Sequence, residues 1–351
     1  MLFSVALAGA FATASLANPI KRADQLSVKV TGPSSGSIDS VDQLKFTAEI
    51  TNNGAETVKV LKYGTILDAL PTRSFTVTQN GTNIPFVGAK VSVALNNDNA
   101  YTTIESGKTV TVSHDVASLF DFATAGPGTF TFTPISEFRV AGTEEKAAHP
   151  ALLASLSSSA EAIEVEIKDV GSKQVKRAEP ECSDSSKLSF IKSSYTESKE
   201  LASITADYIT SSGASDELYT SYFGSASTSQ VAGVFSGVAG ESGSRTLSCT
   251  DPANACDGNV IAYTIISTTD IYFCDIFFDE VPQSQLCGGT TPAARNIRGG
   301  TTLHELTHAL SDTDDVTYGC SADQALPQSQ KTINADNYNC FASEVYAATQ
   351  C

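Results

Sequence analysis

Short runs in which apolar and polar residues alternate fill the first half of the chain. Alternation with a period of two places one face of an extended segment in a core and the other face in solvent. Gly, Asn, Pro and Ser, which favour turns, separate these runs. The clearest runs are Leu26–Val30, Lys45–Ile50, Thr57–Leu61, Ser74–Thr78, Thr109–Ser113 and Thr129–Thr133. Several short strands at regular spacing predict an all-β sandwich that extends to about Val170.

This half also contains a turn signal and two isolated histidines. Asn80-Gly81 stands between two alternating runs and predicts a hairpin turn. Asn80-Gly81-Thr82 is in addition an acceptor sequence for N-glycosylation. His114 and His149 lie outside any motif, and we interpret them as surface or turn residues.

The second half mixes helical and strand patterns. Apolar residues at helical spacing predict helices over 186–212, 214–223 and 337–349. Gly and Ser are frequent over 224–244 and predict a loop there. Runs rich in β-branched and aromatic residues predict strands at 245–249, 260–266 and 270–278. Helices that flank a small sheet predict an α+β domain for this half.

The composition changes at Lys176-Arg177. All eight cysteines follow this pair, no two of them form a C-x-x-C motif, and their even number predicts four disulfides in an oxidising compartment. Residues 1–17 form a short apolar run that ends in small residues, which predicts a secretory signal peptide without the usual basic start. A dibasic pair at such a boundary is a site for a kexin-like protease. We therefore predict a propeptide over 18–177 and a mature enzyme over 178–351, and Lys21-Arg22 is a second dibasic pair.

The charge of the chain is strongly negative and unevenly distributed. The net charge is −17, and residues 178–351 contain 7 Lys and Arg against 22 Asp and Glu, a net charge of −15. This charge disfavours nucleic acid and anionic membranes and attracts basic polypeptides. No later apolar run is long enough to span a bilayer. We expect a secreted, soluble monomer whose partners are protein or peptide substrates.

The segment His304-Glu305-Leu306-Thr307-His308 carries the strongest chemical signal. Residues four apart lie on one face of a helix, so both imidazoles can reach one small cation. In the H-E-x-x-H arrangement two histidines bind zinc, and the glutamate accepts a proton from water. Leucines at helical spacing and the two preceding glycines are consistent with a buried helix that begins after a turn. We predict that His304 and His308 bind Zn²⁺ and that Glu305 is catalytic.

The residues alone leave several candidates for the third zinc ligand. Catalytic zinc takes three protein ligands, and the second half has no histidine outside the motif, so a carboxylate is expected. The longer motif H-E-x-x-H-x-x-G-x-x-H is absent, because positions 311 and 314 are Ser and Asp. Asp312, Asp314 and Asp315 follow the motif, and Glu344 lies on the last predicted helix. All four carboxylates are candidates at this point.

A second segment shows a resemblance to a known family. The H-E-x-x-H segment followed by Asp315-Val316-Thr317-Tyr318-Gly319 resembles the deuterolysin family of fungal neutral zinc proteases, the aspzincins, whose second motif is G-T-x-x-D-x-x-Y-G. The resemblance implies that Asp315 is the third zinc ligand and that Tyr318 stabilises the oxyanion. The Gly-Thr opening is replaced by Ser311 and Asp312, which leaves Asp314 as an alternative to Asp315.

The resemblance also implies an architecture and a disulfide pattern. It implies a zincin-like α+β protease domain preceded by a signal peptide and a long propeptide. The pattern that it implies pairs Cys182 with Cys249, Cys256 with Cys274 and Cys287 with Cys351, and leaves Cys320 for Cys340.

We predict a secreted endopeptidase with one Zn²⁺ per chain and a preference for basic proteins. One alternative is a thermolysin-like protease that uses Glu344 as its third ligand. Another is a secreted protein that binds zinc without catalysis. The sequence leaves open whether the propeptide inhibits the enzyme or only assists folding.

Overall fold

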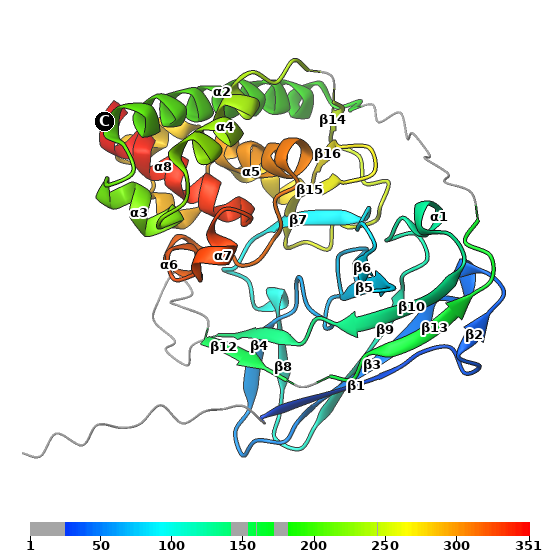
Figure 1. The fold of residues 1–351 in the computed structure, drawn as a ribbon. Helices are drawn as coiled ribbons and strands as arrows, with labels where there is room; N and C mark the ends of the chain where they lie inside the picture. Colours follow the sequence, from blue (N-terminus) through cyan, green and yellow to red (C-terminus); the bar gives the residue numbers. More distant parts are fainter. Residues whose placement is uncertain (1–24, 142–153, 159, 172–181, 244) are drawn as a thin grey trace, which may run out of the picture.

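The computed structural model describes residues 25–141, 154–158, 160–171, 182–243 and 245–351, which form a mixed α+β structure (Figure 1). The predicted signal peptide, both dibasic pairs and His149 lie outside the described residues. The helices of the second half gather on one side of the molecule, and most strands of the first half lie on the other. No helix in the described part of the chain combines the length and hydropathy needed to cross a membrane.

Three sheets of the first half share one hydrophobic core. The first has the order β1 (Leu26–Thr31), β3 (Lys45–Asn52), β9 (Thr109–Asp115). The second has the order β2 (Ser37–Ile38), β13 (Ile163–Ile167), β10 (Gly128–Pro134), β5 (Phe75–Gln79), β6 (Thr82–Asn83). The third has the order β12 (Ala154–Ser157), β11 (Glu137–Val140), β4 (Val58–Leu61), β8 (Tyr101–Ile104). A short helix, α1 (Phe122–Ala125), packs its buried Phe122 against the same core.

The alternating runs of the sequence explain this core. Along β3 every second residue from Phe46 to Asn52 is buried, as a strand with one covered face requires. The aromatic rings of Phe46, Phe75 and Phe132 meet at the centre, with ring centroids 4.8 to 6.3 Å apart. Burial of these rings stabilises this part of the chain.

The hairpin prediction at Asn80-Gly81 is confirmed, but the interpretation of His114 is wrong. β5 and β6 pair across the two turn residues, which both have positive φ angles, and Asn80 is exposed. His114 lies in β9 with its side chain on the buried face. Its Nε2 lies 3.0 Å from the carbonyl oxygen of Ile66, and burial lowers its pKa. A histidine that has a hydrogen-bond partner can occupy a core position.

Five longer helices lie in the described part of the second half. They are α2 (Ser185–Ser212), α3 (Glu217–Phe223), α4 (Thr228–Ala239), α5 (Arg298–Ser311) and α8 (Ala335–Gln350). Two short helices, α6 (Cys320–Gln324) and α7 (Gln328–Lys331), lie between α5 and α8. The loop predicted over 224–244 is wrong, because α4 forms there. Val231, Phe235 and Val238 bury one face of α4, and this spacing outweighs the glycine and serine content.

A small sheet lies against α5. Its order is β14 (Leu247–Ser248), β16 (Asp270–Phe273), β15 (Val260–Ile265), β7 (Ala89–Val93). The predicted strand over 270–278 ends at Phe273, because residues 275–279 form a 3-10 helix that buries Phe277.

The outer strand β7 comes from the first half of the chain, so the two halves share this sheet. It pairs antiparallel with β15 and places Val91 opposite Tyr263. Figure 1 shows β7 between the helices and the other sheets of the first half. All five of its residues are buried, so its sequence lacks the alternation that marks a half-exposed strand.

Four disulfides fix the second half, and among the described residues no cysteine is free. The pairs are Cys182–Cys249, Cys256–Cys274, Cys287–Cys351 and Cys320–Cys340, the pattern implied by the family resemblance. The last pair links the start of α6 to α8 and so fixes the segment that follows the H-E-x-x-H helix.

Candidate active site

Helix α5 presents the H-E-x-x-H segment in the interior of the molecule. Every residue from Gly299 to Ala309 is buried. The two glycines let neighbouring helices approach closely. A Cβ atom at Gly299 would lie 2.8 Å from Cβ of Glu197 in α2, and one at Gly300 would lie 2.3 Å from Oδ1 of Asn339 in α8. The glycines therefore fix the position of the helix that carries both histidines.

The structure brings His304, His308 and Asp315 together. The two Nε2 atoms are 3.1 Å apart, and Oδ1 of Asp315 lies 3.0 Å from Nε2 of His304 and 3.2 Å from Nε2 of His308. Three donors about 2.0 Å from one tetrahedral zinc ion are separated by roughly 3.3 Å, so this triangle has the size that zinc requires. Among the described residues, this group and one containing the disulfide Cys320–Cys340 are the clusters with metal-ligand spacing.

The hydrogen-bond partners and neighbouring charges of His304 and His308 favour a cation at this site. Nδ1 of His308 lies 2.6 Å from the carbonyl oxygen of Thr313, which can only accept a hydrogen bond, so the proton of a neutral ring is on Nδ1 and Nε2 is free to bind a metal. Burial opposes a charge on His304, but the nearby carboxylates of Asp315 and Asp336 raise its pKa to about 10. The donor set thus favours a positive charge at its centre.

Glu305 lies beside this group with one oxygen atom fixed and one free. Its Oε2 accepts a hydrogen bond of 2.7 Å from the Thr264 hydroxyl of β15. Its Oε1 is buried and has no hydrogen-bond partner among the described residues. Burial raises the pKa of Glu305 to about 6. A carboxylate with this pKa can accept a proton near neutral pH and release it again.

Two residues outside the sequence motifs support His304. Oδ1 of Asp336 lies 3.5 Å from Nδ1 of His304, on the side of the ring that faces away from Asp315. The buried Arg295 holds this carboxylate through Nε and Nη2 at 3.0 and 2.8 Å. Sequence reasoning missed Arg295, Asp336 and the Glu305 partner Thr264, because no spacing rule connects them to the H-E-x-x-H segment.

The other carboxylates considered as metal ligands lie elsewhere. Asp312 ends α5 with a φ angle of 51° and has an exposed side chain. The Asp314 carboxylate faces Lys90 and Arg73 at 3.0 and 3.4 Å. Glu344 accepts a hydrogen bond of 2.5 Å from the Tyr222 hydroxyl and is not part of the histidine cluster. Of the four candidate carboxylates, the structure places only Asp315 at the two histidines.

Strand β7 passes directly over the site. The backbone N–H of Val91 donates to Oδ2 of Asp315 at 2.8 Å, and the Tyr318 hydroxyl donates to the carbonyl oxygen of Val91 at 2.7 Å. Two of the predicted site residues therefore contact the backbone of one residue of the first half of the chain. The contacts use only the backbone of Val91, so any residue in an extended chain could make them.

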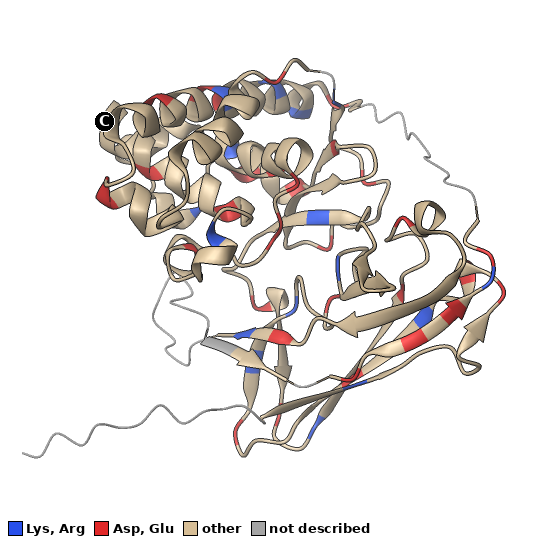
Figure 2. Ribbon diagram, in the orientation of Figure 1, with Lys and Arg blue, Asp and Glu red and all other residues tan. Residues whose placement is uncertain are grey.

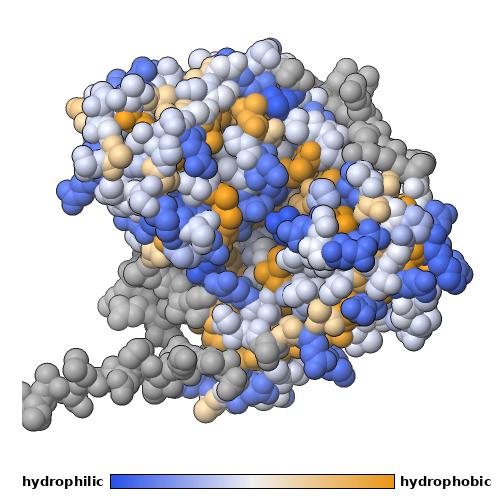
Figure 3. Space-filling view, viewed as in Figure 1, coloured by the Kyte–Doolittle hydropathy of each residue, from blue (hydrophilic) through white to orange (hydrophobic). Residues whose placement is uncertain are grey.

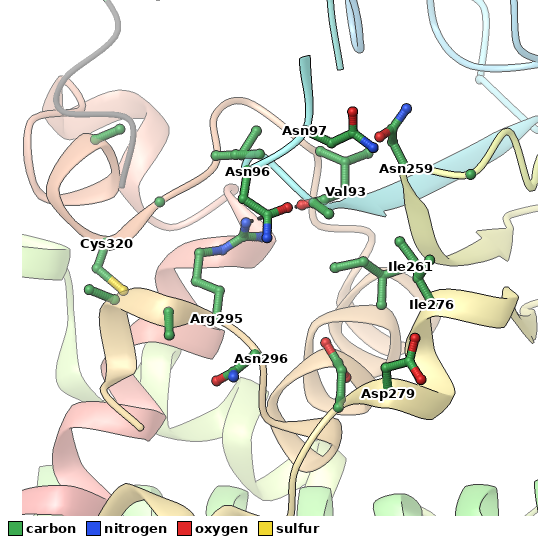
Figure 4. A pocket seen from close by; sticks show the side chains of 18 of the residues that line it. Val93, Asn96, Asn97, Asn259, Ile261, Ile276, Asp279, Arg295, Asn296 and Cys320 are labelled. Atoms are coloured by element: carbon green, nitrogen blue, oxygen red, sulfur yellow. Dashed lines mark hydrogen bonds between the residues drawn. The ribbon is translucent and has the colours of Figure 1, made fainter. Parts of the chain in front are cut away.

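A pocket of about 450 Å³ opens beyond the C-terminal end of β7 (Figure 4). Arg295 projects into it and donates from Nη1 to the carbonyl oxygen of Val93 at 3.2 Å. Ile261, Ile276 and Asp279 line the opposite wall. The space-filling view shows apolar residues in the hollow between the two halves of the molecule (Figure 3). An extended polypeptide could thus continue from the site into this pocket.

Comparisons with known proteins agree with this geometry. A sequence model of the deuterolysin metalloprotease (M35) family matches residues 2–349. A neutral protease 2 homolog of Botryotinia fuckeliana is 31% identical over 324 residues, which cover 85% of this chain and 87% of that protein. Homologs with the same printed description from Aspergillus fumigatus and Sclerotinia sclerotiorum are each 30% identical and cover 89% and 85% of this chain, and 71% and 86% of their own lengths. The chain therefore belongs to the deuterolysin family of zinc metalloendopeptidases.

Proposed function

We propose that the chain is a secreted zinc endopeptidase that is made as a preproenzyme. In this proposal residues 1–17 are the signal peptide, 18–177 a β-sandwich propeptide and 178–351 the zincin-like enzyme, released by cleavage after Lys176-Arg177. The observation that carries the proposal is the position of the Val91 backbone. This backbone lies between Asp315 and Tyr318, at the cluster formed by the two histidines of the H-E-x-x-H helix.

His304, His308 and Asp315 would hold one zinc ion. Their three donor atoms lie 3.0 to 3.2 Å apart, and the tautomer of His308 leaves its Nε2 free. Bound zinc polarises a carbonyl group and acidifies water, which is the chemistry that peptide hydrolysis requires.

Glu305 and Tyr318 would manage the proton and the developing charge. The free Oε1 of Glu305 accepts the proton of the attacking water, while Thr264 holds Oε2 and fixes the orientation of the carboxylate. The Tyr318 hydroxyl donates to the scissile carbonyl oxygen as it gains negative charge. Its present bond to Val91 supports this role, because the hydroxyl already reaches a peptide carbonyl. Burial raises the pKa of Tyr318 well above its usual value, so the hydroxyl keeps its proton.

The position of β7 supports a proenzyme. A substrate strand that adds to the edge of β15 would need the place that β7 occupies. In this proposal β7 keeps substrates out until the chain is cut between β13 and α2. In the uncut chain the propeptide therefore acts as an inhibitor.

Charge supports basic proteins as substrates and a monomer as the working form. Acidic residues outnumber basic ones in the second half of the chain, and Figure 2 shows red segments on most of its helices. A field of this sign attracts cationic polypeptides and disfavours self-association. Added salt should weaken the attraction, so cleavage of a protamine-like protein should slow as ionic strength rises.

The test is to express the whole chain in a host that cuts at dibasic pairs and to analyse the secreted protein. We expect one zinc per chain and casein cleavage that a chelator abolishes. Glu305→Gln should retain zinc and lose turnover, whereas Asp315→Asn should lose most of the zinc. A metal-free wild-type protein would refute the proposed metal site. Unchanged turnover in Glu305→Gln would refute the proposed mechanism.

A further inference from the structure

The side chain of Lys90 fills a polar hole beside the active site. It is 7% exposed, although it belongs to the outer strand β7. Its Nζ lies 2.7 Å from Oδ1 of Asp312, 2.7 Å from the carbonyl oxygen of Thr313 and 3.0 Å from Oδ1 of Asp314. A buried ammonium group is stable only when its hydrogen atoms have acceptors. With the carbonyl oxygen of Asp312 at 3.3 Å, four acceptors surround the three N–H donors of lysine.

The residues that surround the ammonium group are held in place by the second half of the chain itself. Nδ1 of His308 contacts the Thr313 carbonyl at 2.6 Å, and the hydroxyls of Thr307 and Thr313 lie 2.8 Å apart. The backbone of Asp314 forms two hydrogen bonds at the start of α8, of 2.6 Å to Ile333 and 3.0 Å to Ala335. The backbone around the ammonium group is therefore held by the second half itself, whereas the carboxylates of Asp312 and Asp314 face Lys90 and Arg73. The hole also lies at the C-terminal end of α5, where the helix dipole favours cations.

The register relates Lys90 to the reacting position. Val91 follows Lys90 directly, and its carbonyl oxygen is the one that meets the Tyr318 hydroxyl. β7 runs antiparallel to β15 and contacts the site through the backbone of Val91, so a substrate strand can take the same path. The bond that corresponds to the scissile one is then Val91–Ser92. A substrate lysine at the second position before the cleaved bond would point into the hole that Lys90 fills.

We propose that Asp312, Thr313 and Asp314 form a subsite for a lysine side chain of the substrate, located two residues before the cleaved bond. This inference rests on the proposed endopeptidase function. The geometry selects lysine over arginine, because three short contacts converge on one point and suit a compact ammonium group better than a planar guanidinium group. Arg73 differs from Lys90 in this respect. Its guanidinium group is partly exposed, lies 3.4 Å from the Asp314 carboxylate and stacks over Phe86.

The experiment uses two peptides with the secreted, processed protein. One has the sequence of residues 86–97, and the other has norleucine in place of lysine, which keeps the length of the chain and removes the charge. We expect cleavage between the positions of Val91 and Ser92, with kcat/KM at least tenfold higher for the lysine peptide. In the double variant Asp312→Asn/Asp314→Asn this ratio should fall to near one. The matched control Asp207→Asn/Glu217→Gln removes two exposed charges of the same half and should keep the wild-type ratio.

A binding measurement separates the subsite from catalysis. Fluorescence anisotropy with the Glu305→Gln protein should show a Kd at least tenfold lower for the lysine peptide. Equal Kd values, or a preference that persists in Asp312→Asn/Asp314→Asn, would overturn the subsite. If the Glu305→Gln protein discriminates between the peptides but the zinc-loaded wild type cuts neither, the endopeptidase proposal fails and the subsite stands.

Discussion

The buried carboxyl group of Glu280 should make the stability of the protein fall as pH rises. Glu280 lines the pocket beyond β7, and its Oε1 accepts a hydrogen bond of 2.8 Å from the Thr301 hydroxyl of α5. Its Oε2 is buried without a hydrogen-bond partner among the described residues. Burial raises the pKa of Glu280 to about 8, so the folded protein keeps this group neutral at pH 7.

The size and sign of the effect follow from the difference between the folded and unfolded states. In the unfolded chain the pKa of a glutamate is about 4.3, so between pH 4.3 and 8 the folded state binds one more proton. The free energy of unfolding therefore decreases by about 1.4 kcal/mol per pH unit in this window, because of this group. The stability associated with the neutral carboxyl group of Glu280 is complete below its pKa in the unfolded chain. It is lost as pH rises through its pKa in the folded protein.

Glu280→Gln replaces the neutral acid by a neutral amide of the same shape. Its Oε1 can still accept the hydrogen bond from Thr301. We expect the variant to be more stable than the wild type by about 1 kcal/mol at pH 5 and about 4 kcal/mol at pH 7, because ionisation no longer favours the unfolded chain.

The assay is urea unfolding of the full chain followed by far-UV circular dichroism at pH 5, 6 and 7, with disulfides intact. Glu217→Gln, at an exposed position of α3, is the control and should track the wild type. The difference between wild type and Glu280→Gln isolates this group from the other titrating residues. A difference that stays constant between pH 5 and 7 would refute the assigned protonation state.

Three further predictions concern catalysis and the framework of the second half. Thr264→Val should lower kcat about tenfold with unchanged zinc content, because Glu305 loses a charge-assisted hydrogen bond, and an unchanged kcat would contradict this. Cys320→Ser with Cys340→Ser opens a loop of 20 residues and should cost about 3 kcal/mol, seen as a lower Tm by calorimetry, whereas an equal Tm would count against it. Phe235→Ala should destabilise by about 3–5 kcal/mol in urea unfolding, while Gln230→Ala on the exposed face should not; equal effects would show that α4 does not pack as described.

Local patterns in the sequence predicted the parts of the fold that depend on neighbouring residues. The alternation in β1, β3, β9 and β10 and the helical spacing in α2 and α8 each reflect one covered face, so their positions were close to those in the structure. The spacing of His304 and His308 likewise placed both imidazoles on one face of α5. Helix α4 was missed because glycine and serine are weak helix formers, and its packing against α2 and α5 compensates for them.

Features that depend on distant segments could not be read from the sequence. β7 is fully buried between β15 and the loop that carries Asp315, so nothing in its own five residues indicates a partner more than 150 positions away. Thr264 and Asp336 reach the site from a strand and from a different helix. The resemblance to the deuterolysin motif was needed to favour Asp315 over Asp314. In the structure the carboxylates of these adjacent residues face the histidines and Lys90 respectively.

Cleavage of the connection between β13 and α2 would change the energetics of β7 without changing a single contact. In the proposed proenzyme, β7 would compete with substrate at the high effective concentration of a tethered ligand. After the proposed cleavage the same strand would compete only at the molar concentration of the released propeptide, which falls on dilution. Contacts to the backbone of Val91 and to the ammonium group of Lys90 are also contacts that a lysine-containing substrate can make. In the proposed proenzyme one site thus explains both inhibition in the intact chain and substrate choice in the processed one, because a strand that resembles a substrate can block the site only while it remains attached.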